Sequence, residues 1–200
     1  MRDPSGALVL EVGPYVVAGS PEFAEKIGAI AAARSQAEVN LNCLFGVLLG
    51  ATPEEAAREL ARCRTASEVT RKVRAVAGEV IQGPDFNSLS TLLGQLDHVR
   101  ARRNRLQHDV WASKPSESGR LYVIHAKDYL DLAMRLVAVH TTAGTTGSEE
   151  AIERSMAFVE TVSCGYSIAD LAELETAIHS VSTALLRTMF QCLGLPIERS

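Results

Sequence analysis

Apolar residues recur at helical spacing along most of the chain, and the clearest series begins near residue 20. Ser20 is a favourable N-cap, Pro21 suits the first helical position, and Glu22 lies near the positive end of the helix dipole. The apolar positions that follow are three, four or seven residues apart and include Phe23, Ile27, Ile30, Ala37, Leu41, Leu44 and Leu48. This spacing predicts one long helix from Ser20 to about Gly50.

Six more helices are predicted from the same combination of capping residues and periodic apolar positions. Thr52-Pro53-Glu54-Glu55 and Ser167-Ile168-Ala169-Asp170 are capping boxes, in which a hydroxyl and an acidic side chain satisfy the first N–H groups of a helix. The expected ranges are 53–62, 65–82, 87–108, 127–140, 149–162 and 168–189. The chain is therefore expected to be helical over most of its length.

Short extended segments complete the pattern. Leu8–Leu10 and Tyr15–Val17 flank Gly13-Pro14 and predict a hairpin near the N-terminus, while Val110–Ala112 and Leu121–Ile124 predict two strands around a polar loop. The expected fold is mostly α, a single-domain helical bundle with a minor β-hairpin.

Three segments are expected within this one domain. Residues 1–19 are an extended N-terminal segment, residues 20–145 the helical core, and residues 146–200 a C-terminal helical elaboration packed on the same domain. Gly144–Ser148 is expected to be a linker between helices.

The composition is that of an ordinary globular protein, with 46% hydrophobic and 22% charged residues. The four cysteines are far apart in the sequence and form no C-x-x-C pair, and the apolar run Ala7–Val17 is interrupted by Glu11, Gly13 and Pro14. These features favour free thiols in a reducing cytoplasm, with no membrane association and no cofactor.

The net charge of −4 argues against a global electrostatic attraction for nucleic acid. A local basic patch is nevertheless present, because between residues 100 and 114 a single acid, Asp109, accompanies five bases: Arg100, Arg102, Arg103, Arg105 and Lys114. The sequence contains no Walker loop, dinucleotide-binding turn, H-E-x-x-H pair or G-x-S-x-G elbow, which argues against most cofactor-dependent and hydrolase functions.

The end of the predicted helix 87–108 carries the most specific pattern. Arg103 is followed directly by Asn104 and, after four intervening residues, by His108. An arginine, a polar residue and a histidine in this arrangement, at the end of a long helix, resemble the signature of the HEPN family of small helical bundles. Motif and helical context together cover roughly residues 20–145.

This resemblance implies a metal-independent endoribonuclease that acts through attack of the ribose 2′-OH. His108 would act on the 2′-OH or the leaving oxygen, Arg103 would hold the phosphate, and Asn104 would orient one of them. Arg100, Arg102, Arg105 and Lys114 would contact RNA. The family also implies a homodimer and a toxin or phage-defence role with a nucleotidyltransferase-type antitoxin as partner.

Helix geometry favours the dimer. Asn104 and His108 are four residues apart on one face, whereas Arg103 is about 140° around the helix from His108. The two converge only if Arg103 reaches around the helix, if His108 lies past the helix end, or if a second copy contributes to the site. The predicted helix 87–108 has an apolar stripe of Leu89, Leu92, Leu96, Val99 and Leu106. Arg103 lies seven residues after Leu96 in this stripe, where a charge needs a partner, and Glu38 is a candidate.

Structural interpretations remain open for each of these residues. On a structural interpretation, Arg103 forms an ion pair and His108 interacts with the C-terminal end of the helix dipole. The other arginines then form a solvated face of the helix. Trp111 is expected to be a core residue, and His98, His125, His140 and His179 ordinary helix or surface residues. The alternative function is a non-enzymatic, HEPN-like dimeric module that binds a nucleotide or a protein, and an unrelated bundle with a chance match is the third possibility.

Overall fold

The structure is a computed structural model that describes residues 1–142 and 147–195, with residues 140, 142, 147 and 148 described for their backbone only. The expected segment boundary at residues 145–146 and most of the expected linker 144–148 lie outside the described residues, as does the side chain of His140. Within the described residues the chain is mostly helical with a small antiparallel sheet, which confirms the mostly α part of the expected fold class.

Eight helices occur in the part of the chain that the structure describes. They are α1 (Pro14–Ala18), α2 (Pro21–Leu49), α3 (Pro53–Leu60), α4 (Ala66–Val80), α5 (Pro84–His108), α6 (Ala126–Thr142), α7 (Gly147–Thr161) and α8 (Ile168–Cys192). Four strands form one antiparallel sheet in the order β1 (Glu11–Val12), β2 (Val110–Ser113), β3 (Leu121–Ile124) and β4 (Gly165–Tyr166). Each of the seven predicted helices is present.

The expected N-terminal hairpin is wrong. Tyr15–Val17 belong to helix α1, and β1 pairs with β2 instead of folding back on its own neighbour. Gly13 has a φ of 141°, a conformation open to glycine, and Pro14 occupies the first position of the helix. The Gly13-Pro14 pair therefore starts a short helix and is not the turn of a hairpin.

The described chain divides into two compact units, each of which combines residues from more than one of the predicted segments. Unit 1 consists of residues 1–28 and 104–172, and unit 2 of residues 29–103 and 173–200.

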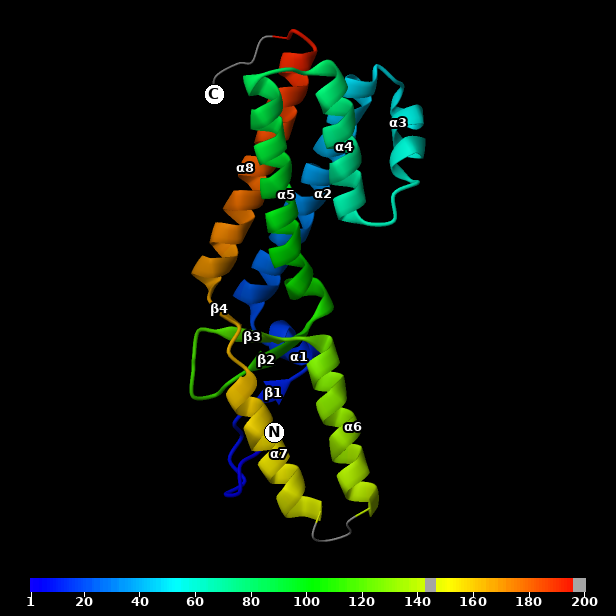
Figure 1. Ribbon diagram of the computed structural model, residues 1–200. Helices are drawn as coiled ribbons and strands as arrows, with labels where there is room; N and C mark the ends of the chain where they lie inside the picture. The colour runs from blue at the N-terminus through cyan, green and yellow to red at the C-terminus, as the bar shows by residue number, and fades with distance from the viewer. Residues whose placement is uncertain (143–146, 196–200) are drawn as a thin grey trace. The chain divides into compact units, whose positions relative to one another are not determined.

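Unit 1 is built on the sheet, with α6 and α7 packed against each other (Figure 1). The two strands predicted around a polar loop are confirmed as the β2–β3 hairpin, in which Trp111 pairs with Val123. A buried cluster lies between the sheet and its neighbouring segments and consists of Leu10, Ala112, Tyr122, Ile124 and Val162.

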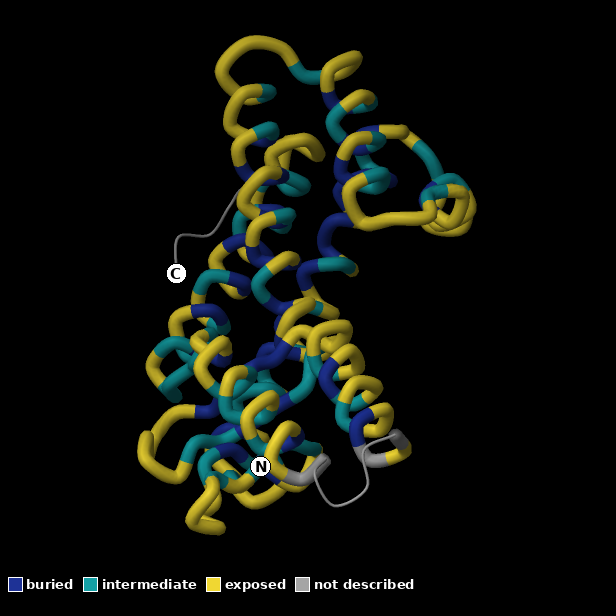
Figure 2. Tube along the Cα trace, turned by 60° about the horizontal axis from the view of Figure 1, so that its bottom comes forward, coloured by how far each residue is buried: buried dark blue, intermediate teal, exposed yellow. Residues whose placement is uncertain are grey.

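Unit 2 is a bundle formed by α3, α4 and the larger parts of α2, α5 and α8. Each of these helices buries one face, as the alternation of buried and exposed residues along the trace shows (Figure 2). The largest fully buried side chains of this unit are Ile30, Leu41, Leu44, Phe45, Leu89, Leu93, Leu96, Leu174 and Ile178. Ile30, Leu41 and Leu44 belong to the apolar series predicted for the first long helix.

A buried arginine connects three helices of this bundle. Arg100 on α5 forms a bidentate ion pair with Glu38 on α2, donating from Nε at 2.9 Å and from Nη2 at 2.5 Å. Its Nη1 donates to Thr70 Oγ1 on α4 at 2.6 Å and to Asp97 at 3.1 Å. Burial alone would lower the pKa of Arg100, but the hydrogen bonds and charges of Glu38 and then Asp97 outweigh it and raise that pKa. Arg100 is thus a charged structural residue.

We expect Arg100→Ala to lower the free energy of unfolding by about 3 kcal/mol, because Glu38 would be left without its bidentate partner. Arg102→Ala is the matched control on the same helix. Arg102 is half-buried and pairs with Glu173, whose side chain is 71% exposed, so its loss should cost less than about 1 kcal/mol. Urea unfolding followed by circular dichroism measures both, and equal losses would contradict the structural role of Arg100.

Candidate functional site

The C-terminal end of α5 carries the sequence motif, and it is held in place by a hydrogen bond from β2. The indole N–H of Trp111 donates to the carbonyl oxygen of Leu106 at 3.0 Å, and the backbone N–H of Asp109 donates to Arg105 at 3.2 Å. These donors satisfy two of the carbonyls that a helix leaves free at its end. Trp111 is 9% exposed, which confirms that it is a core residue.

Arg103 is buried near the end of unit 2. Arg103 is 8% exposed. Its pKa is lowered, first by burial and then by the charge of Arg34 on α2, whereas the charge of Glu38 acts in the opposite direction. Glu38, the mate considered for Arg103, gives its bidentate pair to Arg100 and lies 3.6 Å from Arg34 Nε. Arg34 and Arg103 are therefore two neighbouring cations, and Glu38 pairs with Arg100 and Arg34.

Asn104 and His108 belong to unit 1, and both are exposed. Among the described residues, His108 has no hydrogen-bond or ion-pair partner, so its imidazole is accessible. His108 is also the last residue of α5. It therefore does not lie past the helix end, which was one of the three ways for it to approach Arg103.

The remaining residues expected to contact RNA differ in accessibility. Arg105 is exposed and Arg102 is half-buried beside Glu173, whereas Arg100 is held inside unit 2. Lys114 is 15% exposed, donates from Nζ to the carbonyl of Val162 at 2.7 Å and lies 4.7 Å from the centre of the Tyr122 ring. Arg102 and Arg105 are thus the two cations of this group that offer a guanidinium to solvent.

A cavity of about 260 Å³ lies in unit 1 beside Arg105. It is lined by the end of β3, the start of α6 and the end of α7, which meet at the sheet (Figure 1). His125 is among its residues, and its Nδ1 accepts a hydrogen bond from the backbone of Lys127 at 3.3 Å. Asp109, the residue after His108, accepts from the backbone N–H of Ala126, the residue after His125, at 3.3 Å. This bond joins the end of α5 to the start of α6.

Sequence reasoning missed Arg34 and His125. Arg34 lies on a predicted helix far from the motif in sequence, and only tertiary packing brings it near Arg103. His125 was assigned as an ordinary residue because no second chemical group accompanied it in the sequence. Its position directly before a predicted helix was the one available signal.

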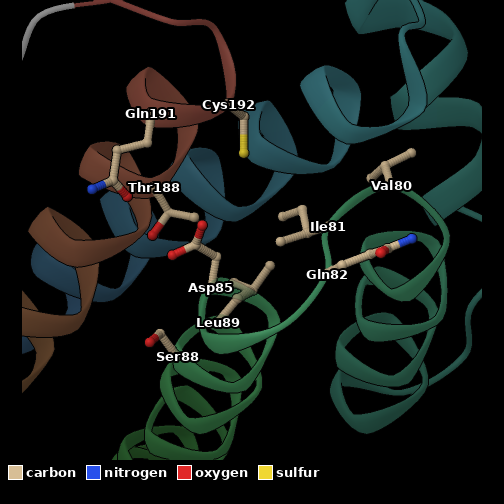
Figure 3. A pocket seen from close by; sticks show the side chains of 9 residues that line it. All are labelled: Val80, Ile81, Gln82, Asp85, Ser88, Leu89, Thr188, Gln191 and Cys192. Carbon is tan, nitrogen blue, oxygen red and sulfur yellow. The ribbon is translucent and has the colours of Figure 1, made fainter.

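A larger cavity of about 450 Å³ lies in unit 2 (Figure 3). Its polar side chains come from α5, α8 and the segment before α5, and include Gln82, Asp85, Ser88, Thr188 and Gln191. Burial and then the charge of Asp85 raise the pKa of the Cys192 thiol, which keeps it protonated and weakly nucleophilic at neutral pH. The residues lining this cavity include no histidine, lysine or arginine, so it offers fewer groups for acid–base chemistry than the end of α5.

Within the described residues, no three His, Cys, Asp or Glu side chains gather as a metal site would require. The helices of the same residues include none with the length and apolar character needed to cross a membrane.

Comparisons with protein-family models, with curated proteins and with solved structures give no significant match.

We expect Trp111→Phe to lower the free energy of unfolding by about 1–3 kcal/mol, because the buried carbonyl of Leu106 would lose its donor. Tyr15→Phe removes an exposed hydroxyl that donates to Val12 at 2.7 Å, where water can replace it, so it should cost less than about 1 kcal/mol. Circular dichroism during urea unfolding reports both variants. A Trp111→Phe protein as stable as wild type would show that this bond does not hold the end of α5.

Proposed function

We propose that the protein is a metal-independent endoribonuclease of the HEPN type, with Arg103, Asn104 and His108 as its catalytic residues. The observation that carries the proposal is an accessible His108, without a structural partner among the described residues, at the end of the helix that also holds Arg103. A histidine left exposed and unengaged is available for chemistry, whereas a purely structural one is normally held by a partner.

The charges around Arg103 support phosphate binding. Arg34 lies near Arg103, and its charge adds to burial in lowering the pKa of Arg103. The repulsion between Arg34 and Arg103 is relieved when an anion binds near them. An RNA phosphodiester is such an anion, and guanidinium forks suit its oxygens.

The proposed reaction uses no group from outside the chain and the RNA. The 2′-oxygen attacks the adjacent phosphorus as its proton passes to a base, the bond from phosphorus to the 5′-oxygen breaks, and that oxygen takes up a proton. The products are a 2′,3′-cyclic phosphate and a 5′-hydroxyl. An imidazole has one nitrogen that can accept the first proton and, once protonated, can donate the second.

We expect a two-fold homodimer, because a second copy supplies the pairing of Arg103 and His108 that one helix does not provide. Analytical ultracentrifugation at micromolar concentration should give twice the chain mass of 21.5 kDa. A monomer under these conditions would remove the shared-site arrangement.

We expect the purified protein to cut RNA in excess EDTA and to leave 2′,3′-cyclic phosphate ends. His108→Ala should abolish cleavage with little loss of stability, since an exposed histidine at a helix end contributes at most about 1–2 kcal/mol through the dipole. Arg103→Ala should also abolish cleavage, and loss of a buried cation is expected to change stability as well. Gel analysis of the cleavage products and thermal melts report the two effects.

His179→Ala is the matched control for this cleavage assay, because His179 is 62% exposed and lies on α8, away from the motif in sequence. It should cut RNA like wild type. Cleavage that survives His108→Ala, or that requires added Mg²⁺, would contradict the mechanism.

A second candidate function, a non-enzymatic module that binds a protein partner, is favoured by one feature of α6. Leu130, Met134 and Val137 are each about 60% exposed and recur at spacings of four and three residues on one face. Exposed apolar rows of this kind mark interaction surfaces. Absence of RNA cleavage by a dimeric, folded protein would favour this second function. For the nuclease, a role as a toxin with a nucleotidyltransferase-type partner remains a prediction.

A further inference from the structure

The cavity beside Arg105 combines an apolar floor with groups that donate and accept hydrogen bonds. Val123, Ile124 and Val162 contribute apolar surface, and Phe158 adds a half-buried aromatic ring. The polar side chains around them are Arg105, Asp109, His125, Asp128, Thr161, Ser163 and Cys164. An apolar cavity with a few convergent polar groups is the usual form of a small-ligand site.

Two of these groups are charged and open to a ligand. Arg105 and Asp128 are both exposed, and neither side chain has a hydrogen-bond or ion-pair partner among the described residues. Asp109, in contrast, accepts the hydrogen bond from Ala126. The cavity therefore presents one available guanidinium and one available carboxylate.

The volume of about 260 Å³ is slightly below the range of about 300–1,000 Å³ that holds drug-sized ligands, so it suits one nucleobase and not a longer segment. Phe158 and the aliphatic floor provide a surface for a flat ring. Arg105 lies three residues before His108, so a base held here belongs to a nucleotide close to the proposed reaction centre.

We propose that this cavity binds a guanine base of the RNA substrate, with Asp128 and Arg105 reading its edges. Guanine is the one common base with two adjacent donors, N1–H and the 2-amino group, which a carboxylate accepts together. It also presents O6 and N7, the pair of acceptors that an arginine fork recognises. Adenine lacks the adjacent donors, and the pyrimidines lack N7. The inference rests on the proposed function only in the assumption that the bound guanine belongs to an RNA substrate.

The test measures binding without cleavage. Isothermal titration of the His108→Ala protein with 3′-GMP, 3′-AMP, 3′-CMP and 3′-UMP should show 3′-GMP binding about tenfold more tightly than the other three. Asp128→Asn should remove this preference, because an amide cannot accept both donors. Arg105→Gln should weaken the binding of 3′-GMP more than the binding of the other three nucleotides.

Asp131→Asn is the matched control, since Asp131 is an exposed carboxylate one turn further along α6 that does not line this cavity. It should retain the preference, and thermal melts establish that each variant is folded. Equal affinity for the four nucleotides, no binding up to millimolar concentration, or a preference that survives Asp128→Asn would each overturn the assignment.

These outcomes are separate from those of the cleavage assay. RNA cutting by wild type together with indiscriminate nucleotide binding would refute the guanine site and leave the nuclease proposal standing. A guanine preference in a protein that cuts no RNA would refute the nuclease and support a base-binding module. If both hold, the cut sites in wild type should cluster next to guanine, and Asp128→Asn should disperse them.

Discussion

The carboxylate of Glu38 is the group on which the electrostatics of unit 2 depends. It lies on α2 and is engaged in two hydrogen bonds by Arg100 of α5, which in turn contacts α4 through Thr70. The pair of Glu38 and Arg100 thereby joins three helices, and Glu38 also lies 3.6 Å from Arg34 Nε. The ion pair that stabilises the bundle therefore lies in the same group of charges as Arg34 and Arg103, because both Arg34 and Glu38 affect the pKa of Arg103.

The helices were largely predictable because their signals are local. Thr52 with Glu55 and Ser167 with Asp170 form the expected capping contacts, and the first long helix ends one residue before Gly50, which has a φ of 61°. The N-terminal segment was not predictable in the same way. Gly13-Pro14 is equally typical of a turn and of a helix start, and the pairing of β1 with β2 joins residues about a hundred positions apart. Strand pairing of this range leaves no local pattern, so periodicity cannot choose between the two.

The candidate site was predictable as a sequence motif but not as an arrangement. The sequence indicated which residues were basic, whereas accessibility depends on tertiary packing: Arg105 is exposed, Arg100 is enclosed by Glu38 and Asp97, and Lys114 is held by Val162 and Tyr122. His125 lies near the end of α5, where Asp109 accepts a hydrogen bond from Ala126, and the β2–β3 hairpin separates these two residues in the sequence. Charge along a sequence therefore overestimates the cationic surface that is accessible in the folded chain.

The position of Trp111 has a practical consequence. It is the single tryptophan of the chain and lies in unit 1, with its ring centre 6.3 Å from that of Tyr166. Its fluorescence therefore reports the surroundings of the sheet alone, while far-ultraviolet ellipticity is dominated by helices, many of them in unit 2. Of two optical signals recorded on the unlabelled protein, fluorescence thus follows unit 1 alone, whereas ellipticity follows the helices of both units. Coincident transitions would reveal one cooperative folding unit, and separated transitions would reveal two.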